Sequence, residues 1–484
     1  MSDSEAERSV AERAVRFAVC VGVGLVVLAL PRPESVPPEG WRMLAIFVSI
    51  IAGFLLRPFA MGPLVLFGVV ASSATGTLEL DAALAGYGEK VVWLVVSAFL
   101  LAGAVRDSGL GRRAALLLVR KFGKSTLGVG YAQAGAELLL GPLVPSNTAR
   151  GGGILAPISD SLSRALGSEP GKTSEKAGTY LTLVGAHCNL VTAAMFLTGM
   201  AANPIFAVAA RDVYDVPFDD WTTWALAMIV PGLVSLALLP LALFYIARPT
   251  VTDGRPAQEL ARRELEGLGP WTRAEKILSG VFTLMILLWS VKAWGPLVGL
   301  DLKPDTTMVA LLGVCALLAL NVQPWKRMTH DAATWDTLMW LGGLLTMASA
   351  LKDLGVIGAF AESAGIWFEG APVLPTVIGL ALIYFYSMYA FSMLTAHITA
   401  MAAAFLTICL AAGAPGMLAA PLFAAFSNLC ACTTNYSSGP MIIYFGLGHV
   451  PSTTWFKTGF LVSLLHLLVW IPVGLLWWHF LGWW

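Results

Sequence analysis

Short polar side chains stand together in residues 144–153, a Val-Pro-Ser-Asn-Thr-Ala-Arg-Gly-Gly-Gly tract that lies among hydrophobic segments. Ser146, Asn147 and Thr148 offer two hydroxyls and one amide. These groups can donate hydrogen bonds to carboxylate or sulfate oxygens, or offer oxygens to a sodium ion. Free N–H groups at the start of a following half-helix favour a bound anion. A lone tripeptide of this type is more often a helix cap or a turn. Its position in the chain must therefore decide whether it binds a ligand.

Arg150 follows two residues after this tripeptide. A guanidinium at membrane depth costs at least ~2.5 kcal/mol on insertion scales unless it faces a polar cavity or a partner. We therefore expect Arg150 to face the path of an anion. The alternative is that its side chain extends to the cytoplasmic surface.

Three landmarks around the tract recur in the second half of the chain. They are residues 104–110 with 350–356, Thr148 with Thr395, and Asn189 with Asn435. The members of these pairs are 246, 247 and 246 residues apart. Interrupted apolar segments at matching positions of two repeats are the best sequence indication of a secondary transporter, with its substrate at the repeat interface.

The composition is that of a polytopic α-helical membrane protein. Of 484 residues, 57% are hydrophobic and only 12% are charged. Apolar segments such as residues 225–246 and 460–480 reach the ~20 residues that cross ~30 Å of hydrocarbon. The formal net charge is zero, so nothing indicates nucleic acid as a partner; the expected partners are small anions and the lipid bilayer.

The charge distribution predicts an orientation. Basic residues gather in residues 106–124 and 248–276, and the positive-inside rule places both stretches in the cytoplasm. Arg8, Arg13 and Arg16 put the N-terminus on the same side. No small-residue cleavage site follows the first apolar run, so we expect a retained first helix.

The chain divides into two repeats of opposite orientation. Pro142 and Pro145 disfavour one continuous helix, and irregular backbone at this depth must line a cavity or be buried in protein. A re-entrant hairpin satisfies both conditions. The expected units are residues 1–40 (tail and first helix), 41–247 (first repeat, hairpin near 125–150), 248–273 (cytoplasmic connector) and 274–484 (second repeat, hairpin near 373–404).

Each half is then predicted to contain a second broken helix. The first break is expected at residues 185–189 and the second at 433–440, where Gly439-Pro440 interrupts a helix. The second break would present Asn435, Ser437 and Ser438. His397, two residues after Thr395, either joins the second site or is a hydrogen-bonded core residue.

Catalytic and metal sites are not indicated. The six cysteines are scattered in apolar surroundings and read as small buried hydrophobes. Cys430 and Cys432 lack a second cysteine pair or a histidine at zinc-site spacing. An intramembrane enzyme would need a signature such as His-Glu-x-x-His, which the sequence lacks. We expect no enzyme activity and no cofactor, with sodium as the one ion to consider.

Three motifs together resemble the divalent anion/sodium symporter family. They are residues 145–153, residues 394–397, and residues 435–440 with Tyr444-Phe445-Gly446. Within the family they are most similar to bacterial citrate/succinate antiporters and plastid 2-oxoglutarate/malate translocators. The resemblance implies an all-α membrane protein with about eleven transmembrane helices and two re-entrant hairpins. It also implies a scaffold domain, a transport domain, a homodimer and elevator-type movement.

One departure from the family concerns sodium. Sodium-coupled members resemble one another in carrying Ser-Asn-Thr at both hairpin tips, whereas the second tip here reads Met393-Leu394-Thr395. Methionine and leucine supply no hard oxygen for sodium. Arg150 and His397 would instead supply fixed positive charge, so moving the empty site across hydrocarbon would be costly, which favours obligatory exchange.

We therefore expect an exchanger of malate, succinate, fumarate, 2-oxoglutarate or citrate in a bacterial cytoplasmic membrane. The alternative is a sodium-coupled dicarboxylate or sulfate symporter; a channel fits broken inverted repeats poorly. The predicted substrate-binding residues are Ser146, Asn147, Thr148, Arg150, Thr395, His397, Asn435, Ser437 and Ser438. The candidate cation site comprises Ser146, Asn147, Gly185 and Asn189.

Overall fold

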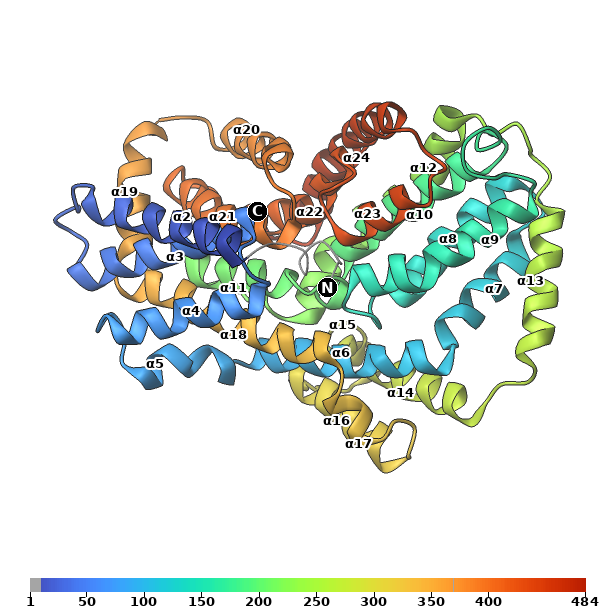
Figure 1. Ribbon diagram of the computed structural model, residues 1–484, viewed down its shortest axis with the longest axis horizontal. Coiled ribbons are helices and arrows are strands. Elements are labelled where there is room, and N and C mark those ends of the chain that lie inside the picture. The colour runs from blue at the N-terminus through green and yellow to red at the C-terminus, as the bar shows by residue number, and fades with distance from the viewer. Residues whose placement is uncertain (1–9, 369) are drawn as a thin grey trace.

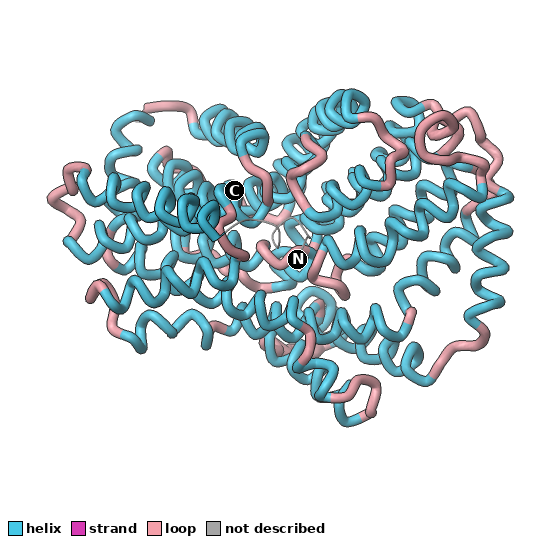
Figure 2. The backbone as a smooth tube through the Cα atoms, in the orientation of Figure 1, coloured by secondary structure: helices cyan, strands magenta, loops and turns pink. Residues whose placement is uncertain are grey.

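The computed structural model describes residues 10–368 and 370–484, so Arg8 lies outside the described part. Helices and loops account for these residues, apart from one isolated β-bridge between Ser125 and Asp253 (Figure 2). The helices of the first half are α2 (Val10–Ala29), α3 (Pro38–Leu56), α4 (Met61–Ala74), α5 (Leu80–Leu84), η1 (Ala85–Gly88), α6 (Lys90–Ser108), α7 (Leu110–Phe122), α8 (Thr126–Leu140), η2 (Thr148–Leu155), α9 (Ala156–Ala165), α10 (Gly178–Met195), η3 (Leu197–Gly199), α11 (Asn203–Tyr214) and α12 (Trp221–Ala247).

The second half continues the all-helical architecture. Its helices are α13 (Arg255–Leu268), α14 (Arg273–Trp289), α15 (Val291–Trp294), η4 (Gly295–Val298), α16 (Thr306–Ala319), α17 (Trp325–Thr329), α18 (Ala332–Asp353), α19 (Val356–Phe368), α20 (Val373–Tyr386), η5 (Ser387–Ala390), α21 (Leu394–Ala411), α22 (Gly416–Leu429), η6 (Cys430–Thr433), α23 (Gly439–Gly446) and α24 (Ser452–Phe480). The expected all-α membrane fold is confirmed.

Within the described part of the chain, seven helical segments are long and apolar enough to cross a membrane. The number rises to nine if two bent pairs, α14 with α15 and η4 (53°) and α18 with α19 (61°), each form one span. The longest spans are α12 and α24. The apolar helices α4 and α16 are too short to be counted as spans.

The first landmark of the repeat ends a helix in both halves. α6 ends before Gly109 (φ 77°), and the turn after α18 contains Gly355 (φ 76°). Positive φ is accessible to glycine at little cost and lets the chain leave the helix axis. α7 follows the first glycine and α19 the second, so the two landmarks perform the same structural task.

Both hairpins are broken helices. In the first, α8 ends at Leu140, and helical structure resumes at Thr148 as η2, a π-helix. In the second, α20 passes through η5 and an extended turn before α21 begins at Leu394. The matching helices α8 and α20 begin 247 residues apart.

The second interruption of the first half does not lie where the sequence indicated. α10 is continuous through residues 185–189, and the break falls at 196–202, just before Pro204 in the first turn of α11. No proline lies in residues 185–189, so nothing there opposes a helix. Helices α10 and α22 begin 238 residues apart. Asn189, inside a helix, and Asn435, inside the second break, are therefore not equivalent.

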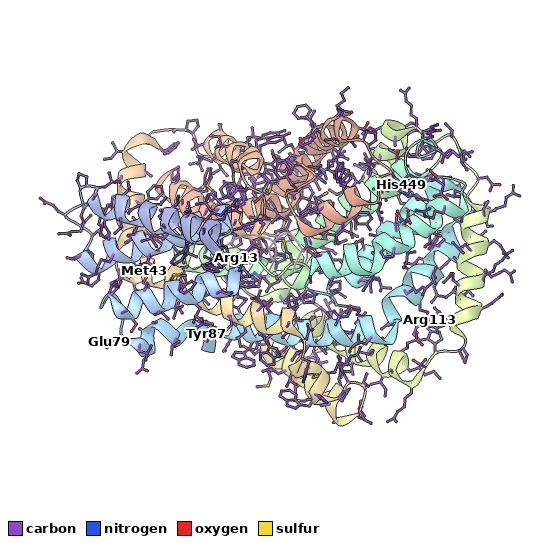
Figure 3. The ribbon with its side chains drawn as sticks, viewed as in Figure 1. Arg13, Met43, Glu79, Tyr87, Arg113 and His449 are labelled. Atoms are coloured by element: carbon purple, nitrogen blue, oxygen red, sulfur yellow. The ribbon has the colours of Figure 1, made fainter. Side chains whose placement is uncertain are left out.

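The connector between the halves is a charged surface helix. α13 runs along one edge of the molecule, past α7 and α9 (Figure 1). Arg113 of α7, labelled beside this edge in Figure 3, is buried and donates to Glu275 (2.6 Å) and to the carbonyl of Gly269 (2.9 Å). Hydrogen bonds from Arg262 and then Arg263 lower the pKa of the Glu259 carboxyl to about 2. The connector is thus ionic and fastened to α7.

The interrupted helices of the two halves pack together. α10 contacts α8, α12, α22 and α23, and α11 contacts α21. On the other side of the molecule α18 packs on α3, α4 and α6, and α16 packs on α6. In Figure 1 green α10 lies beside red α23, so residues distant in sequence meet around the breaks.

Candidate functional site

Arg150 of η2 forms a buried ion pair with Glu137 of α8. The Nε–H group donates to Oε2 of Glu137 at 2.7 Å, and both side chains are 0% exposed. A buried pair of this kind tolerates the loss of neither partner, because the remaining charge would be uncompensated. The pair joins the two arms of the first hairpin across its tip.

Oxygens of the chain engage the other donors of Arg150. Nη1 donates to the carbonyls of Val144 (2.8 Å) and Gly199 (3.0 Å), and Nη2 donates to Thr192 Oγ1 (3.2 Å) and to the carbonyl of Asn189 (3.4 Å). A guanidinium has five N–H donors, and each now has an acceptor. In this arrangement Arg150 has no donor left for a substrate carboxylate, and its expected contact with the anion stays a prediction.

The sequence analysis did not identify Glu137 as a site residue. It is the one carboxylate in the apolar stretch Thr126–Leu140 and stands 13 residues before Arg150, a signal that could have found it. Asn189 supports it, donating from Nδ2 to both carboxylate oxygens (3.0 and 3.1 Å) and to the carbonyl of Asn147 (3.2 Å). This network fixes the hairpin tip against α10.

Two glycines after Arg150 allow this close approach. A Cβ on Gly151 would lie 2.6 Å from Nδ2 of Asn189, and one on Gly152 would lie 2.2 Å from Ile443 of α23. The widened π-helical turn carries Arg150, and such turns are frequent at functional sites. Bare backbone thus packs here against both halves of the chain.

The tip itself divides into used and unused groups. Ser146 Oγ accepts the N–H of Ala149 at 3.1 Å and so caps the turn. Asn147 is 7% exposed, and its Nδ2 has no acceptor in the described structure. The hydroxyl of Thr148 lies against Gly439, where a Cβ would approach Oγ1 to 2.2 Å. The first tip and the second break are therefore in contact.

His397 lies in a different environment on α21. Its Nε2 contacts Ser387 Oγ (2.9 Å) and the carbonyl of Tyr384 (3.1 Å), and its ring packs against Tyr384 and Phe391. A carbonyl can only accept, so this contact assigns the proton to Nε2. Nδ1 is buried without a partner among residues the structure describes. Thr395, two residues earlier, is half-buried.

The second break holds two adjacent serines in different states. Ser437 donates to the carbonyl of Ala431 (2.6 Å) or Thr434 (3.2 Å). The hydroxyls of Ser438 and Thr434 are buried and lack partners in the described part of the molecule. Asn435 is half-buried. Tyr436 Oη donates to the carbonyl of Tyr389 at 3.1 Å, which joins this break to the second hairpin.

The candidate cation site needs correction at Gly185. That residue lies inside α10, where its carbonyl belongs to the helical hydrogen-bond ladder, and a Cβ there would meet Tyr444. The carbonyls outside the hairpin that accept from Arg150 are those of Asn189 and of Gly199, and Gly199 lies in the break that the sequence misplaced. Thr192 and Val144 were also missed, because a backbone acceptor and a mid-helix threonine carry no motif.

The candidate site is thus built from interrupted helices of both halves of the chain. A comparison with protein families matches residues 11–484 to the sodium:sulfate symporter transmembrane region. The chain belongs to this family, also called the divalent anion/sodium symporters.

Relatives cover the chain almost completely. YflS of Bacillus subtilis (strain 168), a protein named for malate transport, is 40% identical over 484 residues, which is 100% of both chains. Dicarboxylate transporter 1 of Arabidopsis thaliana chloroplasts is 38% identical over 468 residues, covering 96% of this chain and 82% of that one. The inner membrane protein YbhI of Escherichia coli (strain K12) is 31% identical, covering 97% and 98%.

A solved structure shares the fold. The Alcanivorax borkumensis YdaH transporter superposes with a TM-score of 0.55 at 14% identity, covering 97% of each chain. The family and its relatives are transporters, so this symporter-family chain is a multi-pass membrane transporter and not an enzyme.

Proposed function

We propose that this chain exchanges dicarboxylates across a bacterial cytoplasmic membrane without sodium. The substrate class follows from relatives named for malate and dicarboxylate transport. Malate, succinate, fumarate and 2-oxoglutarate are the first anions to test, with citrate after them. The N-terminus lies in the cytoplasm in this proposal, two copies form a homodimer, and transport proceeds by elevator movement.

The position of the Arg150 guanidinium carries the proposal. It lies among the carbonyls of Val144, Gly199 and Asn189 and the carboxylate of Glu137. Carbonyl and carboxylate oxygens are the ligands of hard cations such as sodium. A fixed guanidinium that already occupies such a cage leaves no need for a metal ion there.

The second hairpin supports the same conclusion. Its tip residues Met393 and Leu394 have no side-chain oxygen, and His397 lies within the first turn of the following helix. The Nδ1 atom of His397 can take up a proton when an anion arrives, which would supply positive charge in place of a cation.

Unpartnered groups argue for exchange. Asn147 Nδ2, His397 Nδ1 and the Ser438 hydroxyl are buried without partners in the part of the chain described. Each such group costs ~1 to 3 kcal/mol when desolvated without a hydrogen bond. A bound dianion would satisfy several of them, so the loaded site crosses the membrane at lower cost than the empty one.

Counterflow in proteoliposomes tests the coupling. Uptake of labelled malate should require unlabelled dicarboxylate inside, and its rate should be unchanged when choline replaces sodium. Robust uptake into empty vesicles under an inward sodium gradient would instead support a sodium-coupled dicarboxylate or sulfate symporter. A panel of internal anions, sulfate included, would then rank the substrates.

A further inference from the structure

An almost wholly apolar cavity is lined by residues other than those of the polar site. Its volume is about 500 Å³, within the ~300 to 1,000 Å³ typical of ligand pockets. Helices α3 and α18 form one side, α11 and α21 another, and α19 runs along it. The lining includes Leu44, Phe47, Ile205, Leu344 and Phe360. Protein interiors are normally close-packed, so an apolar space of this size that is accessible from outside can take an occupant.

Charges of both signs lie at one end of this cavity. Asp212 is the only charged residue among the described lining residues. Its carboxylate pairs with Arg211 at 3.3 Å on its own helix, and with Lys352 of α18 at 3.7 Å. The side chains of Arg211 and Lys352 are 34% and 44% exposed, whereas that of Asp212 is 13% exposed. The cavity thus combines an apolar interior with a charged, partly solvated rim.

The chemistry of the cavity selects an amphiphile. Water would find too few polar partners in the apolar interior to occupy it stably. Hydrocarbon is the solvent around a membrane-spanning helix, and the 44% exposure of Phe360 leaves the lining accessible from outside. At the rim, a cationic group can pair with Asp212, and an anionic group with Lys352 and Arg211.

We propose that this cavity binds a membrane phospholipid with an ammonium-bearing, zwitterionic headgroup. One acyl chain fills the space between α3, α18 and α21. The headgroup ammonium pairs with Asp212, and its phosphate pairs with Lys352 and Arg211. Because the walls come from α11 and α21, which follow breaks at the polar site, and from α3 and α18, the lipid holds these two groups of helices in their present arrangement.

Fluorescence of Trp41, a lining residue, gives a direct readout. The purified, delipidated full-length protein in detergent is titrated with phosphatidylethanolamine brominated on its acyl chains, since bromine quenches a tryptophan that it contacts. The chain has 17 tryptophans, so the Trp41 signal is taken as the difference between each protein and its Trp41→Phe counterpart. We expect this difference signal to fall by at least half in the wild type.

Two matched substitutions of alanine by phenylalanine distinguish binding in the cavity from contact with bulk lipid. Ala403→Phe fills the cavity and should reduce Trp41 quenching at least threefold, whereas Ala237→Phe, on an exposed part of α12, should leave it unchanged. Equal quenching in both variants would overturn the proposal. Should Ala403→Phe fail to elute as folded protein, Ala348→Leu on α18 serves as a smaller filling variant.

The same titration tests which headgroup is preferred and whether the occupant is a phospholipid or a free fatty acid. Brominated phosphatidylethanolamine should quench at a concentration at least threefold lower than brominated phosphatidylglycerol, and Asp212→Asn should remove that preference. Equal quenching by both lipids in the wild type would overturn the ammonium contact. A brominated free fatty acid that quenches at the same concentration as the phospholipid would overturn the phospholipid as occupant.

Discussion

The two hairpins use the same helix-break-helix design but treat charge in opposite ways. In the first, Arg150 is neutralised by Glu137, and all its donors are engaged by oxygens of the chain. In the second, His397 has no carboxylate partner in the described structure, and one ring nitrogen is unused. The difference indicates that the first hairpin is a fixed internal structure, whereas the second can respond to a bound anion.

This comparison separates residues that hold the site from residues that are proposed to bind. Glu137, Arg150 and Asn189 hold the first tip against α10. Asn147 and His397 each keep an unsatisfied buried atom that a ligand could engage. Substitutions in the first set should therefore reduce stability, and substitutions in the second set should reduce binding.

The largest effect is expected from breaking the buried ion pair. Glu137→Gln leaves the Arg150 guanidinium without its anion in a fully buried position, which costs ~3 to 5 kcal/mol. Arg150→Lys should also lower stability, because a single ammonium cannot reach all the separate acceptors that the guanidinium engages. The midpoint of thermal unfolding in detergent measures the loss.

A charge-balanced variant distinguishes the pair from simple packing. Glu137→Gln combined with Arg150→Met removes both charges and should regain part of the stability that Glu137→Gln loses. Arg164→Ala, which removes two solvent-accessible ion pairs, with Asp160 and with Glu169, is the control and should change the midpoint little. If Glu137→Gln unfolds like the wild type, Arg150 is not held by this carboxylate.

A smaller effect, confined to ligand binding, is expected at the first tip. Asn147→Ala removes the unpartnered buried amide, and Thr148→Ala removes the hydroxyl that lies against Gly439. Each should abolish the thermal stabilisation by malate, a loss of ~1 to 3 kcal/mol in binding, without unfolding the protein. Ser161→Ala, at an exposed position on α9, is the matched control. Undiminished malate stabilisation in both tip variants would remove them from the binding site.

His397 in the second hairpin is expected to make exchange depend on pH. Protonated His397 would pair with a dianion, so wild-type exchange should decline as pH rises through the titration range of His397 in the anion-loaded protein. His397→Gln should lose this pH dependence, whereas His330→Gln, at an exposed turn, should keep it. A wild-type pH profile in His397→Gln would make the histidine a packed core residue only.

Much of the fold was predictable from sequence because broken apolar repeats have few solutions in a membrane. The glycines at 109 and 355 marked equivalent helix ends, and Pro142 and Pro145 marked the first hairpin. The second break of the first half was misplaced, because Asn189 matched Asn435 by offset alone. The stronger helix-breaking signal was Pro204, which begins α11.

The site was less predictable than the fold. The sequence indicated polar motif residues whose role stays a prediction, but the acceptors of Arg150 are mostly backbone carbonyls, which no side-chain pattern reveals. The partner Glu137 lies on the other arm of the hairpin, so the pairing depends on the turn that brings α8 and η2 together. Sequence reasoning recognised that a buried arginine needs a partner but did not find which one.

The smallest effect is expected from Ser437 and Ser438. These adjacent serines test whether a hydroxyl that stabilises the fold can be told apart from one that binds the substrate. The Ser437 hydroxyl donates its hydrogen bond to a backbone carbonyl. Ser437→Ala should therefore lower stability by ~0.5 to 1.5 kcal/mol and leave malate affinity nearly unchanged. Ser438 has no partner for its hydroxyl in the described structure, so Ser438→Ala should weaken malate binding by a similar amount without lowering the unfolding midpoint in the absence of malate. Thermal unfolding of each variant with and without malate measures both quantities. If Ser437→Ala weakens binding and Ser438→Ala does not, the substrate approaches the other serine, and the unpartnered hydroxyl is not a mark of the binding surface.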